Sequence, residues 1–285
     1  MVGMGFSDKY RVDYIGKEIL HISKGIVDNP EFREVIEIGG SKEIVAKADV
    51  MIEDAVADFL KKIPVNLDGE EKRRRVLCEN PLGLIAFDPV DGTNNFVNGS
   101  FFYCSIATIF DSPEPKTLGE AVWAGIYDHV SSKRGYFDNG NVYFVNDKGN
   151  IPQKPESPRI KSISDLTKDN FLNLSLDFGP REIPEDTKPY DDILAKSWRK
   201  NVSCAGYHLM EVASGGSDAY ICPVQKPEEL VAGIPMIEAS GGAVLTFDGK
   251  RAGDLPYDFD KRYSIVAART PQLARELVGM IKSSP

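Results

Sequence analysis

Apolar residues recur at three- and four-residue spacing in two stretches near the start of the chain. Residues 8–27 place apolar side chains on one face of a helix, at Val12, Ile15, Ile19 and Ile22. Residues 43–62 repeat the pattern, with charged residues between the apolar ones. Because this spacing follows the 3.6-residue turn of an α-helix, both stretches are predicted to be amphipathic helices. The charged segment 68–75 that follows is interpreted as a surface connection.

The middle of the chain has the pattern of β-strands. A short apolar run at 84–87 ends at Asp88, and Pro89 is expected to stop the strand because proline cannot continue a sheet ladder. The aromatic and β-branched run 101–110 is followed by a second one at 121–127. These runs predict a sheet with mixed or antiparallel pairs.

The second half of the chain alternates strand and helix patterns. The predicted elements are strands at 171–178, 243–247 and 263–268 and helices at 205–215 and 228–240. A terminal helix is predicted to begin with Thr270 as its N-cap and Pro271 as its first residue. This alternation indicates an α/β layered protein and argues against a helix bundle or a β-sandwich.

Three prolines between residues 150 and 160 indicate a boundary between two lobes. We expect an N-terminal α+β lobe at 1–150 and a C-terminal α/β lobe at 151–285.

The composition is that of a globular protein without a basic field. Of 285 residues, 42% are hydrophobic and 27% are charged, and the formal net charge is −9. This charge argues against nucleic acid or an anionic membrane as a partner. No run of about 20 apolar residues and no signal-peptide pattern occurs, so we expect a cytoplasmic protein. The four cysteines form no C-x-x-C pair and are expected to be free thiols.

The segment that most suggests chemistry is 88–93, Asp-Pro-Val-Asp-Gly-Thr. Asp88 and Asp91 crowd two carboxylates at the end of a strand, where they repel each other unless a cation such as Mg²⁺ neutralises them. Gly92 allows a ligand to approach the backbone, and a helix that begins beside it would point its N–H groups at an anion. The same residues also suit an exposed β-turn. Turn chemistry favours the exposed β-turn, whereas the apolar strands on either side favour the metal and phosphate site. The two interpretations are therefore about equally supported.

The segment 88–96 resembles the signature D-P-[ILV]-D-G-[ST]-x-N-F of the inositol monophosphatase-like, lithium-sensitive phosphatases. This superfamily includes inositol monophosphatases, fructose-1,6-bisphosphatases and nucleotide 3′-phosphatases. Residues 94–96, Asn-Asn-Phe, are more similar to the first two branches than to the nucleotide branch. The resemblance implies an α/β fold of alternating αβαβα layers.

Further segments resemble the superfamily in the same order along the chain. Residues 76–80 are similar to its apolar-apolar-x-Glu-Glu segment, which implies that Glu79 is a metal ligand. Residues 43–49 are similar to its D-L-V-T-x-A-D segment and place Asp49 as an outer acidic residue. Residues 213–220 and 238–242 resemble its A-x-G-x-x-D-A-Y and E-A-G-G stretches.

One segment departs from the pattern. Where the superfamily has W-D-x-A-A-G, this chain has Glu228 and Glu229 in the places of the tryptophan and the aspartate. A carboxylate that is one methylene longer therefore stands at the second metal position. Cys222 stands where inositol-selective members often have a glutamate, so inositol phosphate itself is not implied as the substrate.

The mechanism that the resemblance implies is direct attack of a metal-activated water on phosphorus. The implied metal ligands are Glu79, Asp88, the Val90 carbonyl, Asp91 and Glu229. Thr93, oriented by Asp49 and aided by Glu79, would position and deprotonate the water. The amides of Gly92 and Thr93 would bind the phosphate oxygens.

The sequence thus predicts a phosphomonoesterase with two or three Mg²⁺ or Mn²⁺ ions, acting on a small sugar or polyol phosphate. The resemblance also implies a homodimer. Two alternatives remain open: a phospho-ligand binding or regulatory homologue with an impaired second metal site, and a nucleotide 3′-phosphatase.

Overall fold

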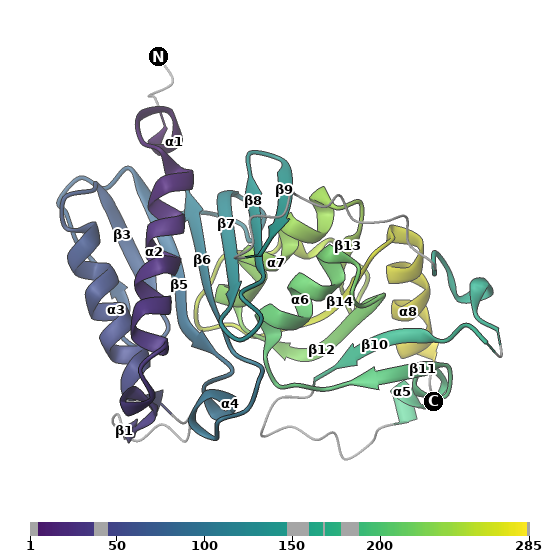
Figure 1. Ribbon diagram of the computed structural model, residues 1–285. Helices are drawn as coiled ribbons and strands as arrows, with labels where there is room; N and C mark the ends of the chain where they lie inside the picture. Colours follow the sequence, from purple (N-terminus) through teal and green to yellow (C-terminus); the bar gives the residue numbers. More distant parts are fainter. Residues whose placement is uncertain (1–4, 37–44, 147–159, 168, 178–187, 284–285) are drawn as a thin grey trace.

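Two β-sheets alternate with three layers of helices in this protein (Figure 1). The computed structural model describes residues 5–36, 45–146, 160–167, 169–177 and 188–283. Within these ranges the order of layers is helix, sheet, helix, sheet, helix, as the sequence predicts.

The first sheet has seven strands in the order β4-β3-β5-β6-β7-β8-β9. Its strands are β3 (Val65–Gly69), β4 (Arg73–Arg75), β5 (Gly83–Asp91), β6 (Cys104–Phe110), β7 (Ala121–Asp128), β8 (Arg134–Asp138) and β9 (Asn141–Val145). All neighbouring pairs are antiparallel except β3 and β5, which run parallel. A separate two-stranded ladder joins β1 (Val35–Ile36) and β2 (Val45–Ala46).

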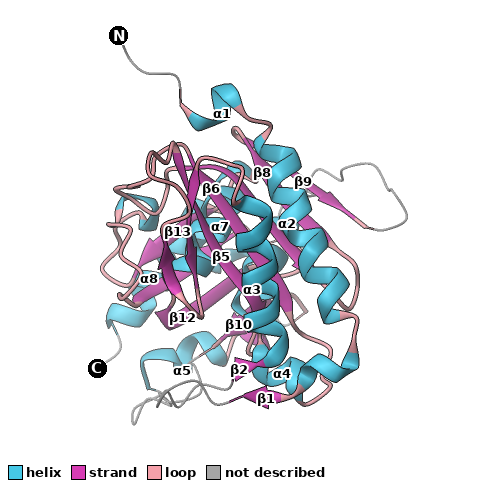
Figure 2. Cartoon of the chain, turned by 90° about the vertical axis from the view of Figure 1, so that its left-hand side faces the viewer, coloured by secondary structure: helices cyan, strands magenta, loops and turns pink. Residues whose placement is uncertain are grey.

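Helices α2 (Val12–Val27) and α3 (Lys47–Leu60) cover the outer face of this sheet (Figure 2). Their apolar stripes are buried because they pack against strands β5 to β7, through residues such as Ile15, Ile19, Ile52 and Val56. A short helix, α1 (Phe6–Lys9), precedes them. Both long helices lie within the predicted ranges 8–27 and 43–62, but they begin later than predicted. Residues 10 and 11 separate α1 from α2, and residues 45 and 46 form β2. Residues 43 and 44 lie outside the described residues.

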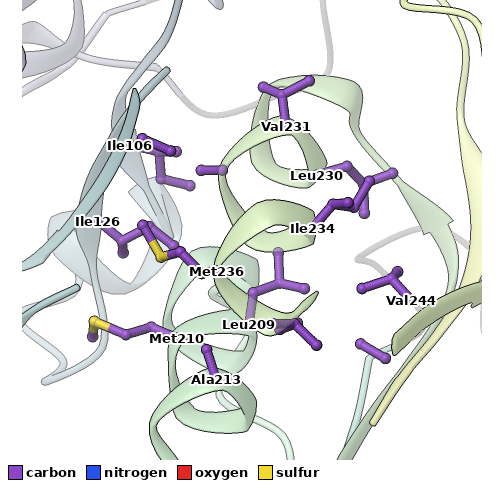
Figure 3. Close-up of a cluster of buried hydrophobic side chains, with 14 of the residues drawn as sticks. Ile106, Ile126, Leu209, Met210, Ala213, Leu230, Val231, Ile234, Met236 and Val244 are labelled. Atoms are coloured by element: carbon purple, nitrogen blue, oxygen red, sulfur yellow. The ribbon is translucent and has the colours of Figure 1, made fainter. Parts of the chain in front are cut away.

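The middle layer consists of α6 (Ala205–Ser214) and α7 (Pro227–Ala239), which lie between the two sheets. Leu209 and Met210 of α6 and Ile234 of α7 meet Ile106 and Ile126 of the first sheet in one apolar cluster (Figure 3). This burial fixes the N-termini of both helices against the first sheet, which matters for the site described below.

The second sheet has the order β11-β10-β12-β14-β13. Its strands are β10 (Leu172–Leu176), β11 (Ser197–Lys200), β12 (Ala219–Gln225), β13 (Ala243–Thr246) and β14 (Tyr263–Ala268). Helices α5 (Lys188–Leu194) and α8 (Pro271–Ser283) cover its outer side. Thr270 caps α8 as predicted, because its hydroxyl accepts a hydrogen bond from the Leu273 amide at 3.1 Å. Short 3₁₀ turns lie at Pro30–Arg33, Ile163–Asp165 and Ala252–Asp254.

The interpretation of residues 68–75 as a surface connection is wrong for its first part. All five residues of β3 are buried, and Asp68 is only 3% exposed. Arg74 binds both carboxylate oxygens of Asp68, and the Tyr257 hydroxyl donates to one of them at 3.0 Å. The carboxylate is buried at tolerable cost because it is paired and hydrogen-bonded.

The expectation that Pro89 ends its strand is also wrong. Strand β5 continues to Asp91, and the register with β6 shifts between Asp88 and Asp91. A proline is tolerated at such an irregularity because no regular ladder bond is required of it. The irregularity turns the end of β5 toward the middle layer of helices, where Asp91 meets α6.

Within the described residues, no helix is both long and apolar enough to cross a membrane. The predicted boundary near residue 150 lies outside the described residues, so the two-lobe division stays a prediction.

Candidate functional site

The register of two parallel strands brings Glu70 beside Asp88. Gly69 of β3 pairs with Phe87 of β5, and the Glu70 amide donates to the Phe87 carbonyl at 3.1 Å. The next residue on each strand therefore lies at the same edge of the sheet. The two carboxyl groups lie close enough for each to act on the pKa of the other.

Asp88 also meets two further carboxylates at this edge, so that three carboxylates from two elements lie together. Asp88, Asp91 and Glu229 each offer an oxygen, and these oxygens lie within 4.8 Å of one another. All three side chains are buried, with exposed fractions of 1%, 7% and 6%. Asp88 and Asp91 come from β5, and Glu229 comes from the first turn of α7. The additional methylene of Glu229 therefore does not keep its carboxylate out of the group.

The electrostatics of this group indicate a missing positive charge. Burial raises the pKa of Asp88 well above its usual range, and Glu70 and Asp91 raise it further. Burial and Asp91 likewise raise the pKa of Glu229. One oxygen of Asp88, Oδ1, is buried without a hydrogen-bond partner among the described residues. Buried carboxylates with these properties are the kind of group that binds a divalent cation.

Lys226 supplies a positive charge at the edge of the group. It precedes α7, and its Nζ forms an ion pair with Glu70 Oε1. Burial lowers the pKa of Lys226, but Glu70, Glu229 and Glu228 outweigh that effect and raise it well above its usual range. The ammonium therefore stays charged.

Glu228 lies next to Glu229 and is 2% exposed. Burial raises the pKa of Glu228 to about 7, although Lys226 acts in the opposite direction. Its Oε2 has no hydrogen-bond partner among the described residues.

Asp49 is fully buried at the start of α3. Its Oδ2 accepts a hydrogen bond from the Ala46 amide at 2.7 Å, and its Oδ1 has no partner among the described residues. Burial raises the pKa of Asp49 well above its usual range, and the charges of Glu71 and Glu70 add to this. Asp49 thus lies within electrostatic reach of Glu70.

The turn after β5 has the geometry of a tight loop that leads into a helix. Gly92 has φ +82°, and α4 (Thr93–Val97) begins directly after it. A Cβ at this position would lie 2.7 Å from the Phe102 carbonyl oxygen, so only glycine suits it. The Thr93 hydroxyl donates to the Val90 carbonyl at 2.8 Å, which leaves its lone pairs free to accept. The described hydrogen bonds of Thr93 do not include one with Asp49.

Asp91 is held firmly from the side of α6. The amides of Ala205 and Gly206 donate to it at 3.3 and 2.5 Å, so the carboxylate lies at the N-terminus of that helix. The thiols of Cys104 and Cys204 both point at its Oδ2, at 3.4 and 3.3 Å. These contacts fix the orientation of the carboxylate before any ligand binds.

Glu79 does not take part in this arrangement. Its side chain is exposed, in the loop between β4 and β5, whereas Asp88 is buried. The acidic groups that act on the Asp88 carboxyl are Glu70 and Asp91. We therefore replace Glu79 by Glu70 in the candidate site. The signal was present in the sequence, because Glu70 and Glu71 form an acidic pair directly after Gly69, the last residue of β3.

The histidines do not contribute to the site. His129 bonds the Ser105 hydroxyl at 2.8 Å, and His208 accepts from the Val202 amide at 3.3 Å. Burial lowers the pKa of both to about 3, so both are neutral.

Comparisons with known proteins agree with this geometry. The sequence profile described as "Inositol monophosphatase family" matches residues 23–284. The chain is similar to a fructose-1,6-bisphosphatase/inositol-1-monophosphatase of Archaeoglobus fulgidus, with 26% identity over 94% of this chain and 97% of the relative.

Solved structures share the fold. The extragenic suppressor protein suhB of Bartonella henselae superposes with a TM-score of 0.77 at 18% identity, over 96% of this chain and 99% of that one. An IMPase/NADP phosphatase complexed with Mg²⁺ and phosphate superposes with a TM-score of 0.73 at 20% identity, over 95% of both chains. These likenesses confirm the predicted layered fold.

Proposed function

Since this chain belongs to the inositol monophosphatase family and is a phosphomonoesterase, we propose that it hydrolyses a small sugar or polyol phosphate with the help of Mg²⁺. The family and the enzyme class predicted from the sequence are both confirmed. The observation that carries the proposal is the buried group of Asp88, Asp91 and Glu229 beside Glu70.

The residues present suit a divalent cation. Asp88 Oδ1 is buried without a donor among the residues that the structure describes. It lies in a group of carboxylates that repel one another, and the ligand atoms that Asp88, Asp91 and Glu229 offer are all oxygens. We propose that Glu70, Asp88, Asp91, Glu229 and the Val90 carbonyl hold Mg²⁺ or Mn²⁺. Ions bound there would stabilise the charge that develops on the phosphoryl group and make water a better nucleophile.

Thr93 is proposed to position the attacking water. Its hydroxyl proton is committed to the Val90 carbonyl, so its oxygen is oriented to accept a hydrogen bond from water. Glu70 is the proposed acceptor of the water's proton, since it lies beside Asp88 at the edge of the sheet. Asp49 is still proposed as the outer acidic residue, because the charge of Glu70 acts on it and its Oδ1 has no partner among the described residues.

The backbone after β5 is proposed to bind the phosphate. Gly92 turns the chain so that α4 starts directly at the carboxylate group, and the Gly92 and Thr93 amides are the proposed donors. A phosphate there would lie close to the metal ligands, as an in-line displacement requires.

The substrate class rests on resemblance. The Archaeoglobus fulgidus relative is named for fructose bisphosphate, a sugar phosphate, and for inositol monophosphate, a polyol phosphate. Residues 94–96 do not support a particular substrate class. The Asn95 amide group donates to the Phe102 and Val202 carbonyls, and Phe96 is fully buried. Their role in the structure is to hold loops together. The homodimer and the cytoplasmic location stay predictions.

The proposal is tested by measuring phosphate release from sugar, polyol and nucleotide monoesters with Mg²⁺ or Mn²⁺. We expect activity on sugar or polyol phosphates, abolished by EDTA. Asp91→Asn should lower kcat by more than about 100-fold, and Asp58→Asn on the surface is the matched control. A preference for nucleotide 3′-phosphates would overturn the substrate class, and full activity of the Asp91 variant would overturn the site.

A further inference from the structure

Among the described hydrogen bonds and ion pairs, Lys226 is the only lysine or arginine that contacts a proposed metal ligand. Its Nζ forms an ion pair with Glu70, which lies beside Asp88. Arg262 also acts on Glu70 through its charge, without a described contact. The two side chains are 24% and 17% exposed, so solvent screens this ion pair only partly. Lys226 precedes the helix that carries Glu229, and the rigid first turn of α7 holds both residues near the group.

The charges around Lys226 are unbalanced. Glu228, Glu229 and Asp88 act on its ammonium in addition to Glu70. With Asp91, the group holds five carboxyl groups. The positive charges that act on them are those of Lys226 and, on Glu70 and Glu228, of Arg262.

Lys226 also accounts for the departure at position 228. The resembling signature has an apolar tryptophan there, and this chain has a buried carboxylate. A buried carboxylate without a nearby cation is costly, and Lys226 lies two positions earlier along the chain. Lys226 and Glu228 thus add one charge of each sign to the site.

Resting on the metal site of the proposed function, we propose that Lys226 is a built-in cation of that site. Its ammonium neutralises Glu70, as a divalent ion would otherwise do. The most weakly bound divalent ion is therefore held less tightly than it would be with an uncharged side chain at position 226. The physical reason is that an ammonium a few Å from a dication repels it and competes for the same carboxylate oxygens. Lysine has three donors and no acceptor, so it cannot become a ligand instead.

The test is Mn²⁺ binding to the full chain without substrate, by isothermal titration calorimetry and by electron paramagnetic resonance of free Mn²⁺. We expect Lys226→Met to bind its weakest Mn²⁺ at least about tenfold more tightly than the wild type, or to bind one more ion. Lys226→Arg keeps the charge and should bind Mn²⁺ like the wild type. Lys133→Met is the matched control, because Lys133 is a similarly half-buried lysine that pairs with Glu211 instead.

Equal or weaker Mn²⁺ binding by Lys226→Met would overturn the inference. Circular dichroism melting checks that each variant is folded, and Lys226→Gln replaces the methionine variant if that one does not fold.

The outcome for Lys226 can be told apart from the outcome for the proposed function. Tighter binding by Lys226→Met in a chain that hydrolyses no sugar or polyol phosphate leaves the inference standing and removes the substrate class. Unchanged Mn²⁺ binding by Lys226→Met in an enzyme that hydrolyses these phosphates removes the inference and leaves the substrate class standing. Absence of Mn²⁺ binding in every variant overturns the metal site and the inference together.

Discussion

Glu70 and Asp88 lie side by side where two parallel strands of the first sheet end. Neither residue is near the other in sequence, and the register Gly69 to Phe87 brings them together. Burial raises the pKa of Asp88, and the charge of Glu70 raises it further. The ammonium of Lys226 lowers the pKa of Glu70. A divalent cation bound beside the two carboxyl groups would favour the charged form of both.

We therefore expect Glu70→Gln to remove activity while Glu79→Gln leaves it intact. An amide in place of the Glu70 carboxylate loses a metal ligand and the proposed proton acceptor, so kcat/KM should fall by more than about 100-fold. Glu79 is exposed, so its substitution should change kcat/KM by less than about twofold. Steady-state kinetics with saturating Mg²⁺ measures both. The reverse result would reinstate Glu79 as the metal ligand.

The contrast between these two glutamates illustrates what the sequence could and could not predict. The fold class, most of the helices and the group around Asp88 and Asp91 follow from periodicity and from one specific motif. Strand β3 does not, because its burial depends on Arg74, which neutralises Asp68, and on Tyr257, which donates a hydrogen bond to it. A linear pattern of charges does not tell which of them will be paired.

The same limit explains why the sequence alone does not place Lys226 at the candidate site. Local sequence places it before a helix, among acidic residues, where a lysine is usually a solvated surface group. Its approach to Glu70 depends on packing between α7 and the first sheet, across 156 residues of chain. Glu229 could be predicted because a carboxylate was expected at its position.

Gly92 is predicted to be irreplaceable for stability as well as for phosphate binding. Gly92→Ala forces a side chain into the left-handed region and brings its Cβ to 2.7 Å from the Phe102 carbonyl oxygen. We expect a loss of about 3 kcal/mol in the free energy of unfolding, measured by urea denaturation. Gly140→Ala is the matched control, since Gly140 has φ +87° but nothing within 4 Å of the added Cβ. It should lose only about 1 kcal/mol. Equal losses in the two variants would mean that the close approach at Gly92 relaxes freely.

His208 is predicted to make the fold sensitive to acid. It is fully buried in α6, stacks on the Tyr220 ring at 5.0 Å, and accepts a hydrogen bond from the Val202 amide. Burial lowers the pKa of His208 to about 3, below its ordinary value of 6.5. The neutral imidazole therefore contributes stability that is fully present above about pH 6.5 and is lost as the pH falls toward the folded-state pKa. At pH 5 the loss should be about 2 kcal/mol, because each unit below the unfolded-state pKa costs about 1.4 kcal/mol.

This prediction is checked by the pH dependence of urea unfolding in wild type and His208→Gln. Glutamine keeps an acceptor for the Val202 amide but cannot take up a proton, so the variant should gain on the wild type by about 2 kcal/mol between pH 7.5 and pH 5. The same substitution at exposed His21 is the matched control, and we expect its difference from the wild type to be the same at both pH values. If the His208 variant runs parallel to the wild type across this range, then the imidazole has the same pKa in the folded and unfolded states, and another buried group must be responsible for any acid unfolding.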